Sequence, residues 1–259
     1  MACRDKSITF LKSFGYNVIR LPKADIAPLQ IFIEKKGILQ PLGNLASVLK
    51  PGEGAVIPPI KRDVTVATFN GRKTGDLSLG LGLNILGNII GAMGGSKLGL
   101  EAGYSKAKTI VFSYGDVLED SIEITELDKY LANSDVDPSS RYVGELLEAN
   151  EIFVLTSTIK TNKVTVEGKG KNSTEAKVDV PVIKEIVGGN IEIKSNNEAD
   201  SSVTFAGNIP LVFGFKAVRL FYEDGEYKRF DPVTDGSMTV AVSPHDKSLY
   251  VIESPLVNL

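Results

Sequence analysis

The feature that most constrains this chain is an uncharged stretch from Leu77 to Ser96, whose first half alternates between apolar and small or polar residues. The apolar positions are Leu77, Leu79, Leu81, Leu83 and Ile85, and those between them are Ser78, Gly80, Gly82 and Asn84. A second alternating stretch presents Leu98, Leu100, Ala102 and Tyr104. Alternation with a period of two is typical of a strand with one apolar face. The two stretches together predict a long hairpin with an apolar tip.

A hairpin of this kind suits a membrane β-barrel. Lipid contacts one face of each barrel strand and water the other, and about 9–11 residues of a tilted strand span the bilayer. Two alternatives remain open. A half-buried hairpin of a soluble sheet also alternates, and a transmembrane helix is suggested by Gly87, Gly91 and Gly95 at the spacing used in membrane helix packing. The many glycines and asparagines make the stretch a poor apolar helix.

Composition favours a soluble chain with one main domain. The 259 residues are 42% hydrophobic and 24% charged, with a formal net charge of −3. This charge provides no general attraction to nucleic acid, so no nucleic-acid partner is expected. The N-terminus lacks the apolar core of a secretory signal, which favours the cytoplasm. The single cysteine, Cys3, excludes an intrachain disulfide and fits a reducing compartment.

The sequence offers little that argues for catalysis. His245 is the only histidine, which excludes an HExxH metal site. The G-x-S-x-G, Walker-A and G-x-G-x-x-G signatures are also missing. We therefore expect no enzyme activity, cofactor or metal. A hydrolase that uses His245 is kept as a remote possibility, which His245→Ala would test.

A second hairpin is predicted further along the chain. A β-rich stretch from Ile152 to Glu167 leads into a polar Gly-Lys-Gly-Lys-Asn-Ser turn. The expected return strand presents Ala176, Val178, Val180 and Val182 on its apolar face. With further strands and short helical stretches, the fold class is expected to be α+β, built on a twisted, mostly antiparallel sheet with peripheral helices.

The order of these features resembles the pore-forming domain of gasdermins. The features are an amphipathic N-terminal helix, Ile-Arg-Leu-Pro at 19–22, the strand Leu29–Lys35, Val-Leu-Lys-Pro-Gly at 48–52, the two hairpins, and the run from Ser202 to Leu220. The resemblance covers roughly residues 5–225. Because the chain stops soon afterwards, it looks like the short bacterial members, without the large repressor domain of animal gasdermins.

The resemblance implies a cytoplasmic, inactive monomer that a caspase-like or trypsin-like protease activates. The cut form would oligomerise into a large ring at the inner membrane, open a β-barrel pore in the lipid and kill the cell, as an antiphage defence. The expected layout is a pore-forming domain over 1–222, a protease-sensitive linker over 223–248 and an autoinhibitory tail over 249–259. The different-class alternative is a β-rich binding or scaffold protein whose hairpins never leave the sheet.

Several residues take expected roles from this resemblance. Cys3 is similar to an S-palmitoylated cysteine, and Arg4, Lys6 and Lys12 are expected to meet anionic lipid headgroups. The apolar residues of the expected tail are Leu249, Val251, Ile252, Leu256, Val257 and Leu259. Candidate cleavage positions are Lys228, Arg229 and Lys247 for a trypsin-like enzyme, and Asp231, Asp235 and Asp246 for an aspartate-specific one.

Overall fold

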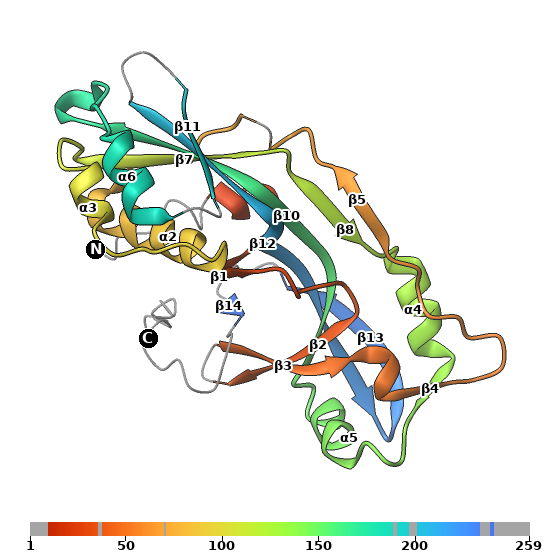
Figure 1. The fold of residues 1–259 in the computed structure, drawn as a ribbon. Coiled ribbons are helices and arrows are strands. Elements are labelled where there is room, and N and C mark those ends of the chain that lie inside the picture. Colours follow the sequence, from red (N-terminus) through yellow and green to blue (C-terminus); the bar gives the residue numbers. More distant parts are fainter. Residues whose placement is uncertain are drawn as a thin grey trace.

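Two long antiparallel strands form the backbone of the fold. The computed structural model describes residues 10–35, 38–69, 71–188, 191–196, 201–233 and 239–240. Within it, β10 (Ile152–Lys169) and β12 (Ser202–Glu223) pair from Glu167 opposite Ser202 to Phe153 opposite Arg219. They run through the length of the molecule and twist strongly (Figure 1). All other parts of the main sheet are built on this pair.

The main sheet has 12 strands among the described residues, in the path β1-β12-β10-β2-β3-β14 with side branches. The remaining strands of this sheet are β1 (Asn17–Lys23), β2 (Gln30–Lys35), β3 (Ile38–Asn44), β5 (Lys61–Thr65), β6 (Leu77–Ser78), β7 (Thr109–Gly115), β8 (Leu118–Ser121), β11 (Glu192–Ser195), β13 (Glu226–Pro232) and β14 (Thr239–Val240). Strand β14 pairs with β3 in parallel, whereas the other described pairings are antiparallel. A separate two-stranded sheet joins β4 (Leu49–Pro51) and β9 (Ser134–Val136).

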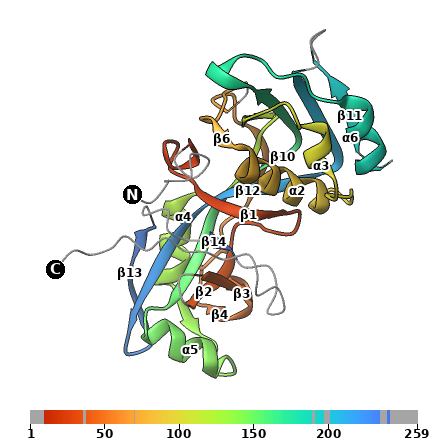
Figure 2. The ribbon, with the colours of Figure 1, turned by 90° about the vertical axis from the view of Figure 1, so that its left-hand side faces the viewer.

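The helices lie at opposite ends of this sheet. The elements at one end are α2 (Leu79–Ala92), α3 (Leu100–Gly103) and α6 (Val180–Val187), and those at the other are α4 (Ile124–Ala132) and α5 (Arg141–Glu148). Two short 3₁₀ helices, η1 (Leu45–Ser47) and η2 (Lys171–Ser173), complete the described elements. Both views show α2, α3 and α6 grouped together, far from α5 (Figures 1 and 2). The expected α+β class with a mostly antiparallel sheet is confirmed.

The apolar core is divided between the two ends and the two faces of the sheet. A first cluster lies under α2, α3 and α6, and a second lies under α4 and α5. Neighbouring residues of β10 point into different clusters, with Val154 in the second and Phe153 in the third. Because successive strand residues face opposite sides, the second and third clusters cover the two faces of the sheet.

The expected first hairpin is not present in this structure. Only Leu77 and Ser78 form a strand, and the residues that follow form α2, a connecting loop and α3. The same segment also carries a helical pattern, because Leu83, Leu86 and Ile90 recur at intervals of three and four and are buried. The strand predicted from the alternation is therefore wrong for this conformation, in which the helical spacing of the apolar residues decides.

The expected return strand of the second hairpin is also wrong for this structure. Residues from Val180 onward form α6, whose start is set by Asp179 and Pro181. The Asp179 carboxylate accepts a hydrogen bond from the Val182 N–H at 3.2 Å, and Pro181 occupies the first turn, where no helical donor is needed. A proline is unfavourable inside a paired strand, which explains the difference.

The expected linker begins as part of the sheet. Residues 226–232 form β13, which pairs with the end of β12 from Glu223 opposite Glu226 to Val218 opposite Pro232. Strand β12 therefore continues into a hairpin at Glu223. Any separate linker can begin only after this strand.

Candidate membrane-insertion segments

The two segments predicted to insert into a membrane each lie between paired strands. Residues 79–108, here called the first segment, connect β6 to β7, and Ser78 pairs with Thr109. Residues 170–201, here called the second segment, connect β10 to β12 and include α6 and β11. Each segment is therefore the connection of an existing antiparallel pair, although most of its described residues form helices and loops.

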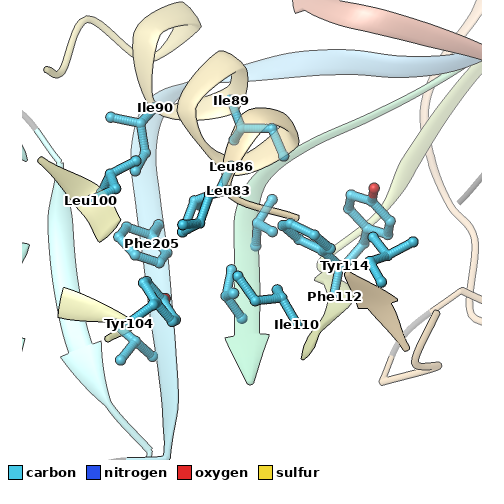
Figure 3. Packing of buried hydrophobic residues seen from close by; sticks show 14 of the residues in the cluster. Leu83, Leu86, Ile89, Ile90, Leu100, Tyr104, Ile110, Phe112, Tyr114 and Phe205 are labelled. Atoms are coloured by element: carbon cyan, nitrogen blue, oxygen red, sulfur yellow. The ribbon is translucent and has the colours of Figure 1, made fainter. Parts of the chain in front are cut away.

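Helix α2 buries one apolar face against the sheet. Leu86 and Ile90 are fully buried, and Figure 3 shows them beside Leu83 and Ile89, facing Phe205 of β12 and Ile110 of β7. No described helix is long and apolar enough to cross a bilayer.

The predicted lipid-facing residues are mostly hidden in this conformation. Those in the buried core are Leu77, Leu83, Leu100, Tyr104, Ala176, Val178 and Val180. Leu79, Ile85 and Val182 are half-buried, whereas Ala102 is exposed. The side chains of Leu81 and Leu98 are exposed, at 38% and 80%. The structure thus collects most of the predicted stripe into one core cluster.

Helix α2 has little stability of its own. It contains Gly80, Gly82, Gly87 and Gly91, and each interior glycine costs about 0.5–1 kcal/mol relative to alanine. Ser78 at its start makes no capping hydrogen bond through its side chain. Gly82 is required by packing, because a Cβ there would lie 2.7 Å from the Cβ of Ile110. Packing on the sheet, rather than helix propensity, holds α2 in place.

Tyr104 adds a further unfavourable contribution. The side chain is fully buried, and its hydroxyl has no hydrogen-bond partner in the described part of the chain. Burial raises the pKa of the Tyr104 phenol. Leaving a buried hydroxyl unpaired costs about 1–3 kcal/mol. The segment that is predicted to move therefore contains a group that would gain from reaching water.

Ion pairs fasten the strands around the segments. Lys169 Nζ at the end of β10 lies 3.1 Å from Asp76 Oδ1, just before β6. Further along β10, Lys160 Nζ bridges Asp120 of β8 and Asp63 of β5 at 2.7 and 2.8 Å. Burial lowers the pKa of Lys160, but hydrogen bonds to the two carboxylates outweigh this effect and raise it. The pairs fix the sheet from which both segments project.

The residues just before β1 pack against the same core through aromatic side chains. Phe14 lies 4.5 Å from Phe69 between ring centroids, and Phe10 stacks near Tyr114 of β7. Lys12, one of the expected headgroup residues, is exposed. The expected acylation site Cys3 and the expected headgroup residues Arg4 and Lys6 lie outside the described residues.

The candidate cleavage positions fall in two groups. Lys228, Arg229 and Asp231 lie in β13, where Arg229 pairs with Phe221 and Asp231 with Arg219. The candidates outside the described residues are Asp235, Asp246 and Lys247. The whole expected tail over 249–259 and His245 also lie outside them. Within the described ranges, no group of three or more His, Cys, Asp or Glu side chains is placed to hold a metal ion.

Comparisons with known proteins identify the family. The model of the Bacterial Gasdermin Family matches residues 19–226. A protein named Gasdermin bGSDM from a Desulfuromonadales bacterium is 48% identical over 237 residues, which cover 92% of this chain and 89% of that protein. A second, from Lysobacter enzymogenes, is 40% identical over 244 residues, covering 93% and 90%. The chain belongs to the bacterial gasdermin family, whose members are pore-forming proteins and are not known as enzymes.

A solved structure supports the fold. The structure of a bacterial gasdermin from Bradyrhizobium tropiciagri matches with a TM-score of 0.62 at 18% identity, covering 93% of this chain and 98% of that one.

Sequence reasoning missed the contacts that hold the two segments to each other. Gly95, Gly99 and Gly103 are spaced four residues apart, which is a helix-packing signal. Their partners in the second segment become visible only in the folded chain.

Proposed function

We propose that this protein is an autoinhibited pore-forming protein, activated when a protease removes its short C-terminal tail. The structure described above is the closed form. After the cut, the protein leaves the cytoplasm for the inner membrane and assembles there into a large ring. Its two segments extend into transmembrane β-hairpins, and the resulting barrel kills the cell, which limits phage infection.

The observation that carries this proposal is that both two-faced segments connect strands that are already paired. Ser78 opposite Thr109 and Glu167 opposite Ser202 are the last pairs before the helices begin. Extending each ladder beyond these pairs converts the helices into hairpins, and in the second segment it also takes β11 off its pairing with β12. Each half of residues 79–108 exceeds the about 9–11 residues that a tilted membrane strand needs.

Contacts after β13 fasten part of the chain that leads to the tail. The Val233 N–H donates to the Ala217 carbonyl at 2.9 Å, and the Asn17 side-chain amide donates to the Val233 carbonyl at 3.4 Å. Further on, Thr239 and Val240 pair with the edge of β3. A tethered tail binds well at modest intrinsic affinity because its effective concentration is high, about millimolar for a short flexible tether. Cutting the tether removes this advantage.

We propose that the activating cut lies after β13. Lys228, Arg229 and Asp231 belong to a strand that is paired with β12, and a protease needs a segment that can enter its active site in isolation. Asp235, Asp246 and Lys247 are therefore the preferred candidates.

S-palmitoylation of Cys3 and headgroup contacts by Arg4, Lys6 and Lys12 complete the proposal. A buried acyl chain contributes about 0.8 kcal/mol per CH₂, and each lysine or arginine about 1 kcal/mol at an anionic surface. The mass of the protein isolated from its native host tests acylation, because a palmitoyl group adds a defined mass to the N-terminal peptide. An unmodified peptide would contradict this part.

Dye release from vesicles tests the central proposal. A recognition sequence for a site-specific protease is placed between residues 241 and 248, and the full chain is mixed with vesicles of phosphatidylethanolamine and phosphatidylglycerol. We expect the dye to be retained until the protease is added and then released. The same protease with the unaltered chain is the control. Retention of the dye after complete cutting would instead favour a β-rich binding protein whose segments stay on the sheet.

A further inference from the structure

The first and second segments contact each other directly, as well as contacting the sheet. Helices α3 and α6 lie side by side in both views (Figures 1 and 2). Two backbone hydrogen bonds join the segments. The Ser96 N–H donates to the Val187 carbonyl at 3.1 Å, and the Asp179 N–H donates to the Gly103 carbonyl at 2.9 Å. The bonds lie at the two ends of the contact, so the segments are tied along its whole length.

Glycines from the first segment and isoleucines from the second fill the space between these bonds. A Cβ placed on Gly95, Gly99 and Gly103 would lie 2.7 Å from Ile191 Cδ1, 3.3 Å from Ile186 Cδ1 and 2.4 Å from Ile183 Cγ1, respectively. Real Cβ atoms essentially never approach another atom within 3.0 Å. The contact therefore requires glycine at its two ends, while Gly99 also has a φ of +86°. We call this set the glycine–isoleucine contact.

Each segment hides the apolar side chains of the other. Ile183 and Val187 of α6 belong to the same buried cluster as Leu100 and Tyr104 of the first segment. All four are at most 3% exposed. If one segment left the sheet alone, apolar surface of the other would be opened to water, which is unfavourable in proportion to its area. Departure of one segment therefore makes departure of the other easier.

We propose that the glycine–isoleucine contact couples the two segments, so that they are released from the sheet as one unit. The contact makes the closed form resistant to partial opening, because neither hairpin precursor is exposed while the other stays folded. It sets how fast the cut protein opens its pore. This inference rests on the proposed function for its consequence at the membrane, but the coupling itself is a property of the uncut chain.

Coupling between two sites is reciprocal, and this property provides the test. Hydrogen exchange is measured on the full, uncut chain. Ile186→Ala changes only the second segment. We expect about tenfold faster exchange at residues 100–104 of the first segment, because the loss of a half-buried side chain weakens the contact by an amount that corresponds to such a change. Gly95→Ala changes only the first segment, and we expect faster exchange across α6. If Gly95→Ala does not fold, the Ile186→Ala result alone decides.

Matched variants control for local effects. Lys184→Ala alters an exposed residue of α6, and Gly91→Ala places a Cβ in open space on α2. Neither variant is expected to accelerate exchange in the opposite segment. Acceleration confined to the substituted segment in both Ile186→Ala and Gly95→Ala would overturn the coupling.

Dye release then separates this inference from the proposed function. After cutting, Ile186→Ala should release dye several-fold faster than the parent chain, whereas Lys184→Ala should match the parent. If the parent releases dye but Ile186→Ala changes neither its release rate nor exchange at 100–104, the coupling is wrong and the pore-forming function stands. If the reciprocal exchange effects occur but the cut parent retains the dye, the coupling stands and the pore-forming function is wrong.

Discussion

At the scale of single residues, the hydroxyl of Tyr104 opposes the closed form. It is buried without a hydrogen-bond partner among the described residues. We expect Tyr104→Phe to raise the free energy of unfolding by about 1 kcal/mol, because the unpaired group is removed. In an inserted strand the hydroxyl can reach water or headgroups, so the substitution does not stabilise the inserted form. Because only the closed form is stabilised, dye release should slow. Denaturant unfolding and dye release measure the two effects.

Tyr222 provides the matched control for this prediction. Its hydroxyl is also buried without a partner among the described residues, but it belongs to the second core cluster, away from both segments. Tyr222→Phe should raise stability by a similar amount and leave the rate of dye release unchanged. Equal slowing by both variants would mean that general stability, rather than the position of Tyr104, controls release.

Leu81 tests whether the first segment faces lipid. Its side chain is 38% exposed in the closed form, whereas Leu83 is only 8% exposed, so an aspartate is tolerated better at position 81. In a membrane strand, a charged group on the lipid face costs up to a few kcal/mol. We expect Leu81→Asp to fold and be cut normally but to lose most dye release.

Asn84→Asp introduces the same charge at an exposed position on the polar stripe, and it should release dye as the parent does. Undiminished release by Leu81→Asp would show that the first segment does not cross the bilayer in the predicted register.

At the scale of elements, α2 is a helix whose sequence also suits a strand. Gly91 is exposed, and a Cβ there would meet nothing within 4 Å. We expect Gly91→Ala to stabilise the closed form by about 0.5–1 kcal/mol through the helix and therefore to slow dye release. Thermal unfolding and release kinetics check the prediction.

Gly144 in α5 is the matched control, because a Cβ there would make only an ordinary 3.6 Å contact with Val136. Gly144→Ala should raise stability without slowing release. A release rate for Gly91→Ala equal to that of the parent would show that the stability of α2 does not control the rate of dye release.

The elements also show what the sequence reveals and what it hides. Runs rich in β-branched and aromatic residues predicted the central strands, because such residues favour strands wherever they are buried. Residues 79–92 have two compatible periods, and only packing against Ile110 and Phe205 decides for the helix in this conformation. Asp179 and Pro181 form a helix-start signal that is present in the sequence, but the apolar alternation around them favours a strand and led to the wrong prediction. The glycine–isoleucine contact joins residues far apart in sequence, so no local pattern predicts it.

At the scale of the whole molecule, one sheet connects β13 to the two segments that are predicted to insert. Strand β12 pairs with β10 along most of its length, with β13 at one end of the molecule and with β11 at the other, near α6 (Figure 1). The Ala217 carbonyl of the same strand accepts the hydrogen bond from Val233. The residue that follows β13 is therefore bonded to the same strand that leads out of the second segment.

Two truncations test where the regulated part of the chain begins. Deleting Lys247–Leu259 leaves β13 and its pairing with β12 intact, so we expect a folded protein that is toxic to cells while the full chain is tolerated.

Deleting everything from Glu226 onward also removes β13, which packs Tyr227 and Phe230 against the second core cluster. Both side chains are half-buried, so each contributes less than the about 1.5–3 kcal/mol of a fully buried one, but their loss together with the β12–β13 pairing should make the longer deletion misfold rather than kill. Viability at matched expression and the soluble yield of each variant distinguish these outcomes. Equal tolerance of the full chain and the shorter deletion would contradict autoinhibition by the tail, and toxicity of the longer deletion would place β13 within the part that is dispensable for the pore.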